Sequence, residues 1–224
     1  MSIQAPSELC PASIVIVDDH EAILEGTLMI LQRRYPDAKF FTALDAKNAK
    51  EKIEDIQPSL VVMDLSIPPA PGENAQTEVG IQLLRDLMQG SPQLNFVVQS
   101  AHVRSLIRLK PAIELHQGGF TISDKSSSMR EMLTRADWAL QGLVYTPRDM
   151  RTNLEVKPEW LEVLLLAFRD GLQDKAIAEQ MHVSERSVRH YWTRVQDALG
   201  VYPEEGKNIR IQTEIRARQE GLLD

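Results

Sequence analysis

Polar side chains stand where three apolar runs of the sequence stop. Asp18 and Asp19 close the first run, Asp64 closes the second and Ser100 closes the third. Neighbouring carboxylates repel one another, so a group of three is favourable only with a cation among them. Carboxylate oxygens and water are the ligands that Mg²⁺ prefers in proteins. The sequence therefore predicts a magnesium site built from Asp18, Asp19 and Asp64.

A second interpretation of the acidic pair remains open. Asp18 and Asp19 precede a helical segment, where a carboxylate is favourable against the positive end of the helix dipole. The pair together with Asp64 favours the metal site over the helix cap. His20 adjoins the pair, and because Mg²⁺ prefers oxygen we expect His20 to start the helix rather than to bind the ion.

These carboxylates meet only if the apolar runs are adjacent strands. Short runs rich in branched residues, without alternation, are typical of buried parallel strands, and they occupy 13–18, 39–43, 60–64, 95–100 and 118–123. Amphipathic segments lie between and after them, at 22–34, 46–56, 80–88, 103–115 and 126–141. The alternation predicts an α/β doubly wound domain with a five-stranded parallel sheet. Its functional crevice lies beyond the carboxyl ends of the strands.

The rest of the chain has a different organisation. Residues 144–156 contain many polar residues, and Pro147 and Pro158 interrupt the periodicity in and just after this segment, which predicts a linker between a first domain at 13–143 and a second at 157–224. Residues 1–12 are expected to be a disordered extension. The second domain shows no strand pattern and contains four helical segments, so we expect an all-α unit with a helix-turn-helix.

One helix of the second domain has two contrasting faces. Val188, Trp192 and two further apolar residues share one face, and the opposite face is basic. A buried stripe opposite a basic face, entered through the N-cap residue Ser184, suits a recognition helix in the major groove of DNA. An ordinary solvated face of a helical bundle is the alternative. The basic face carries Arg186, Arg189, Tyr191 and Arg194.

Composition limits the classes of function. The chain has 224 residues and a net charge of -7, so any binding of nucleic acid must use a local basic patch. The single cysteine, Cys10, excludes an internal disulfide framework. We find neither a secretion signal nor an apolar run long enough to cross a membrane. The sequence therefore predicts a cytoplasmic protein.

The motifs of the first domain resemble a known family. "VDDH" after the first strand and "LVVMD" at 60–64 are similar to the receiver domains of bacterial response regulators of the NarL/FixJ (LuxR-type) class, which have a flavodoxin-like fold. The resemblance covers about residues 13–143. It implies that Asp64 accepts a phosphoryl group from a sensor histidine kinase. It also implies that Mg²⁺ is held by Asp18, Asp19, Asp64 and the carbonyl group of Ser66.

The resemblance also implies that Ser100 and a lysine bind the phosphoryl group and that an aromatic residue, here Phe120, switches position. Two departures mark an atypical receiver. Counted from Phe120, Ser123 stands where the lysine belongs, so either the loop bulges to deliver Lys125 or the salt bridge is missing. We favour Lys125, and a buried core Phe120 is the alternative to a switch. The loop 66–80 is unusually long and is expected to be exposed.

The second domain resembles the LuxR-type helix-turn-helix, through "EVL", "GL", "IA", "VSERSV" and "LGV" in order along 162–201. The resemblance implies binding to double-stranded DNA, with Arg189 in the place of a DNA-contacting lysine. The last helix, with Ile209, Ile215, Leu222 and Leu223, is expected to support a homodimer. The candidate DNA-contacting residues are Arg186, Ser187, Arg189, His190, Tyr191 and Arg194.

The sequence thus predicts a two-component response regulator, a transcription factor controlled by phosphorylation of Asp64, and not an enzyme. The displaced lysine and the long loop motivate an alternative, a regulator that needs no phosphate and is controlled by protein partners. A Mg²⁺-dependent phosphatase is a remote alternative. Such enzymes usually carry a second acid two residues after the nucleophile, and that position is Ser66 here.

Overall fold

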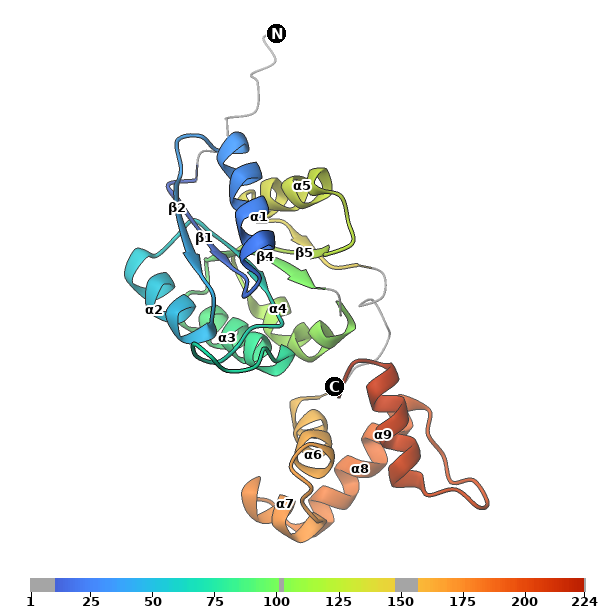
Figure 1. The fold of residues 1–224 in the computed structure, drawn as a ribbon. Coiled ribbons are helices and arrows are strands. Elements are labelled where there is room, and N and C mark those ends of the chain that lie inside the picture. The colour runs from blue at the N-terminus through green and yellow to red at the C-terminus, as the bar shows by residue number, and fades with distance from the viewer. Residues whose placement is uncertain (1–10, 101–102, 148–156, 224) are drawn as a thin grey trace. The chain divides into compact units, whose positions relative to one another are not determined.

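The computed structural model describes residues 11–100, 103–147 and 157–223. The chain divides into two compact units, coloured along the sequence in Figure 1. The first comprises Met1–Val103 and Leu109–Pro147, and the second comprises Arg104–Arg108 and Arg148–Asp224. Residues 1–10 of the extension predicted at 1–12, and residues 148–156 of the linker predicted at 144–156, lie outside the described residues.

The first unit is built on a six-stranded parallel sheet with the order β2-β1-β3-β4-β5-β6. Every residue of the strands at its centre, β1 and β3, is buried, which explains their uninterrupted apolar sequence. The strands are β1 (Ser13–Val17), β2 (Lys39–Ala43), β3 (Leu60–Asp64), β4 (Asn95–Ser100), β5 (Phe120–Asp124) and β6 (Val144–Tyr145).

The α/β class and the five predicted strands are confirmed, and β6 is an addition. Val144 and Tyr145, which the sequence analysis assigned to the linker, pair with Phe120 and Thr121 at the edge of the sheet. A run of two residues is too short to show a strand pattern. The strand order reverses between β1 and β3, so their carboxyl ends are adjacent and border the crevice expected in such folds.

Helices cover both faces of this sheet (Figure 1). Leu24 and Leu31 of α1, with Met132 and Ala136 of α5, pack on β1, β3 and β4 in one apolar core. Pro111 lies in the first turn of α4 instead of interrupting a longer helix, because a first-turn residue needs no N–H donor. The helical elements are α1 (Glu21–Arg34), α2 (Ala46–Ile56), α3 (Thr77–Gly90), the 3₁₀ helix η1 (Val103–Leu109), α4 (Lys110–Leu115) and α5 (Met129–Leu140).

The described part of the second unit contains four α-helices, as the sequence predicts, besides Arg104–Arg108 of η1. Ser184 caps α8 by accepting a hydrogen bond from the backbone N–H of Ser187, and Gly200 ends α8 in the left-handed conformation. The predicted apolar stripe, Val188, Trp192, Val195 and Leu199, is buried in the core of this unit. The helices are α6 (Pro158–Phe168), α7 (Asp174–Gln180), α8 (Glu185–Leu199) and α9 (Ile209–Gln219).

A polar cluster fixes three of these helices to one another. The Asp174 carboxylate, in the first turn of α7, accepts hydrogen bonds from Trp192 Nε1 at 3.0 Å and from the Arg210 guanidinium at 2.9 Å. The Arg210 guanidinium also lies 3.6 Å from the centroid of the Trp192 ring. These contacts set the angle between α7 and α8 and tie both to α9.

The turn between α7 and α8 contains a strained residue. His182 has a φ of 54°, in the left-handed region where a Cβ atom costs about 1 kcal/mol. We expect His182→Gly to raise the free energy of unfolding of the second unit by roughly 0.5–1 kcal/mol, measured by urea denaturation. His182→Ala keeps the Cβ atom and is the control. An equal gain in both variants would show that the backbone strain is not the cause.

Candidate functional site

Two buried carboxylates from separate strands share one ammonium group. Lys125 Nζ lies 2.7 Å from Asp64 Oδ2 and 3.0 Å from Asp18 Oδ2. The side chain of Asp64 is 5% exposed and that of Asp18 is 2% exposed, whereas Lys125 is 21% exposed. Asp64 ends β3 and Asp18 follows β1, so the reversal of strand order brings them together. The ammonium group balances charge that burial would otherwise make unfavourable.

Lys125 reaches the site through a longer strand. The ladder between β4 and β5 continues through Gln99↔Ser123 and Ser100↔Asp124, so the two residues before Lys125 extend the strand without a bulge. The Asp124 carboxylate then accepts hydrogen bonds from the backbone N–H and hydroxyl group of Ser126. This Asx-turn ends the strand and directs Lys125 toward the carboxylates. The sequence analysis missed Asp124, although an aspartate two residues before a serine is a signal for such a turn.

Burial and the neighbouring charges shift the pKa values of Asp64 and Lys125 in opposite directions. Burial raises the pKa of the Asp64 carboxyl group, and the hydrogen bond from Lys125 opposes that shift. Burial disfavours the Lys125 ammonium group, but its hydrogen bonds to Asp64 and Asp18 outweigh this effect and raise its pKa. Lys125 therefore stays protonated at neutral pH and is available to pair with an added anion at Asp64.

Asp18 also belongs to a second group of ligand atoms, with Asp19 and His20. One ligand atom from each of these residues lies within 4.8 Å of the others. The N-cap residue of α1 is His20, whose backbone N–H donates to Asp18 Oδ1 at 2.8 Å. Asp18 and Asp19 thus lie directly before the N-cap residue of α1. Carboxylate oxygens concentrated at one rim fit a hard divalent cation such as Mg²⁺.

The other residues predicted for this site occupy different places. Ser100 ends β4 and is 3% exposed, and its carbonyl group accepts a hydrogen bond from the backbone N–H of Lys125. Ser66 follows Asp64 by two residues, and its backbone donates a hydrogen bond to the Asp64 carboxylate. Phe120 is fully buried at the other end of β5 from Lys125, so in this structure it is a core side chain.

The long loop after β3 is ordered and tied to a helix. The carbonyl groups of Pro68 and Pro69 accept hydrogen bonds from the first N–H groups of α2, those of Ala46 and Lys47. Pro68 is buried, whereas residues 71–76 are exposed as expected. A Cβ atom on Gly80 would lie 2.1 Å from the carbonyl oxygen of Leu65, so this glycine lets α3 pack against the chain beside Asp64.

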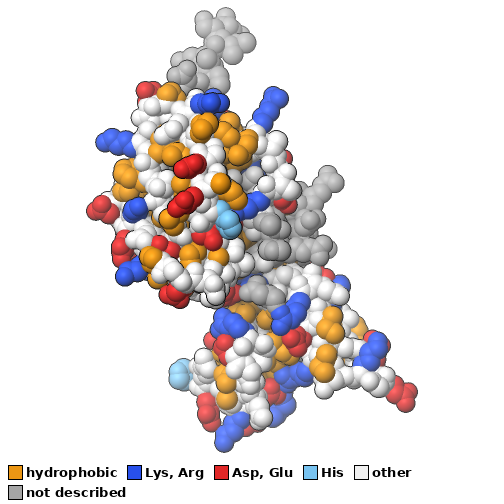
Figure 2. Space-filling view, in the orientation of Figure 1, with side chains coloured by type: hydrophobic (Ala, Val, Ile, Leu, Met, Phe, Trp, Pro, Cys, Tyr) orange, Lys and Arg blue, Asp and Glu red, His pale blue; other side chains and the backbone are white. Residues whose placement is uncertain are grey.

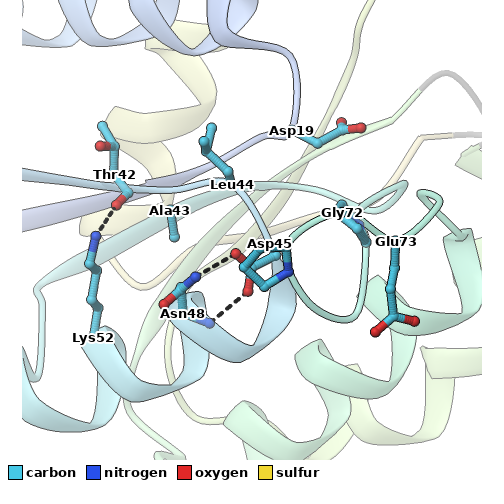
Figure 3. A pocket seen from close by; sticks show the side chains of 11 residues that line it. Asp19, Thr42, Ala43, Leu44, Asp45, Asn48, Lys52, Gly72 and Glu73 are labelled. Atoms are coloured by element: carbon cyan, nitrogen blue, oxygen red, sulfur yellow. Dashed lines mark hydrogen bonds between the residues drawn. The ribbon is translucent and has the colours of Figure 1, made fainter.

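A pocket of about 590 Å³ lies between this loop and the start of α2 (Figure 3). Its polar lining includes Asp19, Asp45 and Lys52. Lys52 Nζ donates to the Thr42 carbonyl group, and the Asp19 carboxylate points away from Asp45. The pocket therefore flanks the acidic rim and does not contain the carboxylates that meet at Lys125.

The predicted basic face of α8 is exposed. Arg189 makes one loose ion pair with Glu185 at 3.6 Å, and Arg186 and Arg194 make none with a described residue. The candidates Arg186, Arg189, His190 and Arg194 are exposed, and Ser187 and Tyr191 are half-buried. In contrast, the three arginines of α9 are neutralised, by the pairs Arg210–Asp174, Arg216–Glu220 and Arg218–Glu214. On the face shown in Figure 2, basic and acidic side chains are interspersed.

The expectation for the last helix needs a correction. Leu222 is 1% exposed and Leu223 is 5% exposed, because both pack into the core of their own unit. They cannot contribute to a dimer contact as proposed from the sequence. Ile215 is 53% exposed, and Ile211, one turn earlier, is 56% exposed.

Comparison with known proteins defines the class of this fold. RcsB from Salmonella enterica serovar Typhimurium, solved bound to promoter rprA in the presence of phosphomimetic BeF3-, aligns with 92% of this chain and 98% of its own, with a TM-score of 0.56 and 17% identity. The chain therefore shares the fold of RcsB, an α/β domain on a parallel sheet followed by an all-α helix-turn-helix unit.

The sequence comparison extends over nearly the whole chain. The transcriptional regulatory protein YdfI of Bacillus subtilis is 24% identical over 224 residues, which cover 94% of this chain and 97% of YdfI. The DNA-binding transcriptional activator DevR/DosR of Mycobacterium tuberculosis is 24% identical over 84% of this chain and 88% of its own. No protein-family model matches the chain. The resemblance to response regulators of the NarL/FixJ class is thus confirmed at the level of the whole chain.

Among the described residues, no helix is both long enough and apolar enough to cross a lipid bilayer.

Proposed function

We propose that this protein is a two-component response regulator and a DNA-binding transcription factor controlled by phosphorylation of Asp64. The observation that carries the proposal is the Lys125 ammonium group between the buried carboxylates of Asp64 and Asp18. A nucleophilic carboxylate beside a fixed cation, at the rim where the strands end, is the arrangement needed to accept and hold a phosphoryl group.

The transfer can be written with the residues of this site. An Asp64 carboxylate oxygen attacks the phosphorus of a phosphohistidine on a sensor histidine kinase, the new O–P bond forms, and the N–P bond to the leaving imidazole breaks. Lys125 and the hydroxyl group of Ser100 then pair with the phosphoryl oxygens. The carboxylates of Asp18, Asp19 and Asp64, with the carbonyl group of Ser66, would hold Mg²⁺, which neutralises charge on the phosphoryl group when bound.

Phosphorylation is tested on the intact chain. In Mg²⁺ and a small phosphodonor such as acetyl phosphate, we expect a mass gain of one phosphoryl group, and we expect Asp64→Asn to abolish it because the amide is not a nucleophile. Asp55→Asn, an exposed acid on α2, is the matched control and should gain the group normally. A mass gain that persists in Asp64→Asn would place the acceptor elsewhere.

We propose that the second unit binds double-stranded DNA through α8. RcsB was solved with DNA, and DevR/DosR is named a DNA-binding activator. The arginines of α8 have less carboxylate compensation than those of α9, so α8 offers the free positive charge that phosphates and guanine edges require. Because residues 157–224 carry 10 Lys and Arg against 12 Asp and Glu, a homodimer on paired sites would add affinity. Such a regulator would act in the cytoplasm.

The alternative, a regulator that needs no phosphate, was motivated by the displaced lysine and the long loop. Lys125 Nζ lies 2.7 Å from Asp64 Oδ2, so the displaced lysine no longer supports this alternative. The long loop still supports the alternative, because its hydrogen bonds to the start of α2 hold it beside the site. A phosphate-independent regulator would bind DNA equally well with and without the phosphodonor. The phosphatase alternative has no support from the site, where Ser66 stands in place of a second acid, and the relatives are named as regulators.

A further inference from the structure

We propose that Arg210 of α9 is a positioning residue for DNA binding, because it holds α8 in the orientation in which the basic face of that helix meets the duplex. The proposal rests on the DNA-binding function proposed above, and it names a residue that controls this function from outside the helix-turn-helix. Arg210 is itself paired with Asp174. It therefore acts through the side chains that it contacts and not as a DNA ligand.

Trp192 determines the direction in which the basic face of α8 points. It lies near the middle of α8 and is 3% exposed. At about 3.6 residues per turn, Arg186 and Arg194 lie roughly 120° and 160° around the helix from Trp192. A rotation of α8 that moves the indole ring out of its place in the core would therefore turn both arginines by the same angle.

The indole ring of Trp192 is held by side chains from the three other helices. Its Nε1–H donates to Asp174 Oδ1 of α7 at 3.0 Å, and Phe168 of α6 packs edge-on against it, with ring centroids 5.6 Å apart. The Arg210 guanidinium covers the ring, with Cζ 3.6 Å from the ring centroid. Two of these three contacts come from Asp174 and Arg210, which also bind each other.

Arg210 makes two interactions that together require a planar cation. Its Nη2 donates to Asp174 Oδ1 at 3.1 Å and to Oδ2 at 2.9 Å, while its Cζ lies over the indole ring. Lysine carries its charge on one ammonium nitrogen and does not replace an arginine that stacks on a ring. The side chain of Asn208 caps α9 and accepts a hydrogen bond from the backbone N–H of Arg210 at 2.9 Å, which fixes the position of the arginine. Arg210→Lys therefore preserves the charge of the unit and removes the stacked contact.

Charge and position predict opposite results for Asp174. Removing a carboxylate lowers the repulsion of DNA phosphates and frees the charge of Arg210, so on charge alone Asp174→Asn should tighten DNA binding. If Arg210 positions α8, Asp174→Asn should weaken binding, because the guanidinium loses the anionic partner that holds it over the indole ring.

Fluorescence anisotropy of the full chain with a mixed-sequence duplex, over a series of salt concentrations, tests the proposal. We expect Arg210→Lys and Asp174→Asn each to weaken binding about fivefold and to lower the slope of log affinity against log salt by about one, the equivalent of one phosphate contact. The matched controls are Arg218→Lys and Glu214→Gln, which make the same changes in an ion pair on α9. Both controls should bind within about twofold of the wild type, because an exposed pair contributes little.

Circular dichroism shows that binding is compared between folded proteins. All variants are measured at a temperature at which each has the far-UV signal of the wild type. The near-UV signal should fall in Arg210→Lys and not in Arg218→Lys, because the indole ring of Trp192 is held less tightly when the stacked guanidinium is lost.

The outcomes separate this inference from the proposed function. If Arg210→Lys binds as tightly as the wild type with the same salt slope, or if Asp174→Asn binds more tightly, Arg210 does not position α8. Equal losses in Arg210→Lys and Arg218→Lys would overturn the inference in the same way. In each of these cases, DNA binding by the wild type leaves the proposed function intact. If the wild type binds no duplex, the proposed DNA binding and this inference are both wrong.

Discussion

Replacing Lys125 with methionine should lower the free energy of unfolding by about 3 kcal/mol in the presence of a chelator. The substitution keeps the length of the side chain but removes the positive charge that contacts Asp64 and Asp18. Both carboxylates are almost fully buried, so each would be left as an uncompensated charge in a site of low dielectric constant. Urea denaturation followed by circular dichroism measures the loss.

Mg²⁺ should restore part of this stability, because an ion that binds only the folded state shifts the equilibrium toward it. Lys50→Met is the control: Lys50 makes an exposed ion pair with Asp86 at 3.7 Å, and such pairs contribute less than about 1 kcal/mol. Equal stability of Lys125→Met and wild type in chelator would mean that the ammonium group does not balance the buried acids. A loss that Mg²⁺ does not reduce would argue against a metal site at these carboxylates.

The second large effect is expected on DNA binding. Replacing Arg186 and Arg194 together with alanine should weaken binding to a mixed-sequence duplex by about 30-fold at low salt, since two lost contacts cost about 1 kcal/mol each. The slope of log affinity against log salt should also decrease by about two. Fluorescence anisotropy over a series of salt concentrations measures both quantities.

A charge-matched variant controls for the change in net charge. Arg216→Ala with Arg218→Ala removes the same charge from α9, where each arginine already pairs with a glutamate. We expect this variant to lose less than about threefold in affinity, because neutralised arginines release few counterions from DNA. If the α8 and α9 variants lose affinity equally, the exposed face of α8 is not the DNA contact.

Much of the fold could be predicted from the sequence, because apolar residues recur at the regular spacings of strands and helices. Residues 14–17 of β1 and 60–63 of β3 are apolar because both faces of these strands are buried, and Ser184 and Gly200 mark the ends of α8 by their capping chemistry. Strand β6 was not predicted, because a strand of two residues is too short to show a periodic pattern of apolar residues. The sequence analysis placed the start of α3 at residue 80, whereas the helix begins at Thr77. Residues 77–79 are only half-buried, so they do not extend the apolar pattern of the helix.

The candidate site was predictable in composition but not in geometry. Asp18 and Asp64, which share Lys125, could be chosen because parallel strands bring their carboxyl ends together. The position of Lys125 could not, because the alignment of a short strand does not show whether two extra residues extend the ladder or form a bulge. The ladder extends, through Ser123 and Asp124.

The most direct test of the central claim measures DNA affinity of the full chain with and without Mg²⁺ and acetyl phosphate, in the wild type and in Asp64→Asn. A receiver that controls the DNA-binding unit predicts a change of about tenfold or more in the wild type, typical of coupling between two sites, and none in Asp64→Asn. Equal affinity of the wild type in both conditions, or an identical response in Asp64→Asn, would contradict control through Asp64.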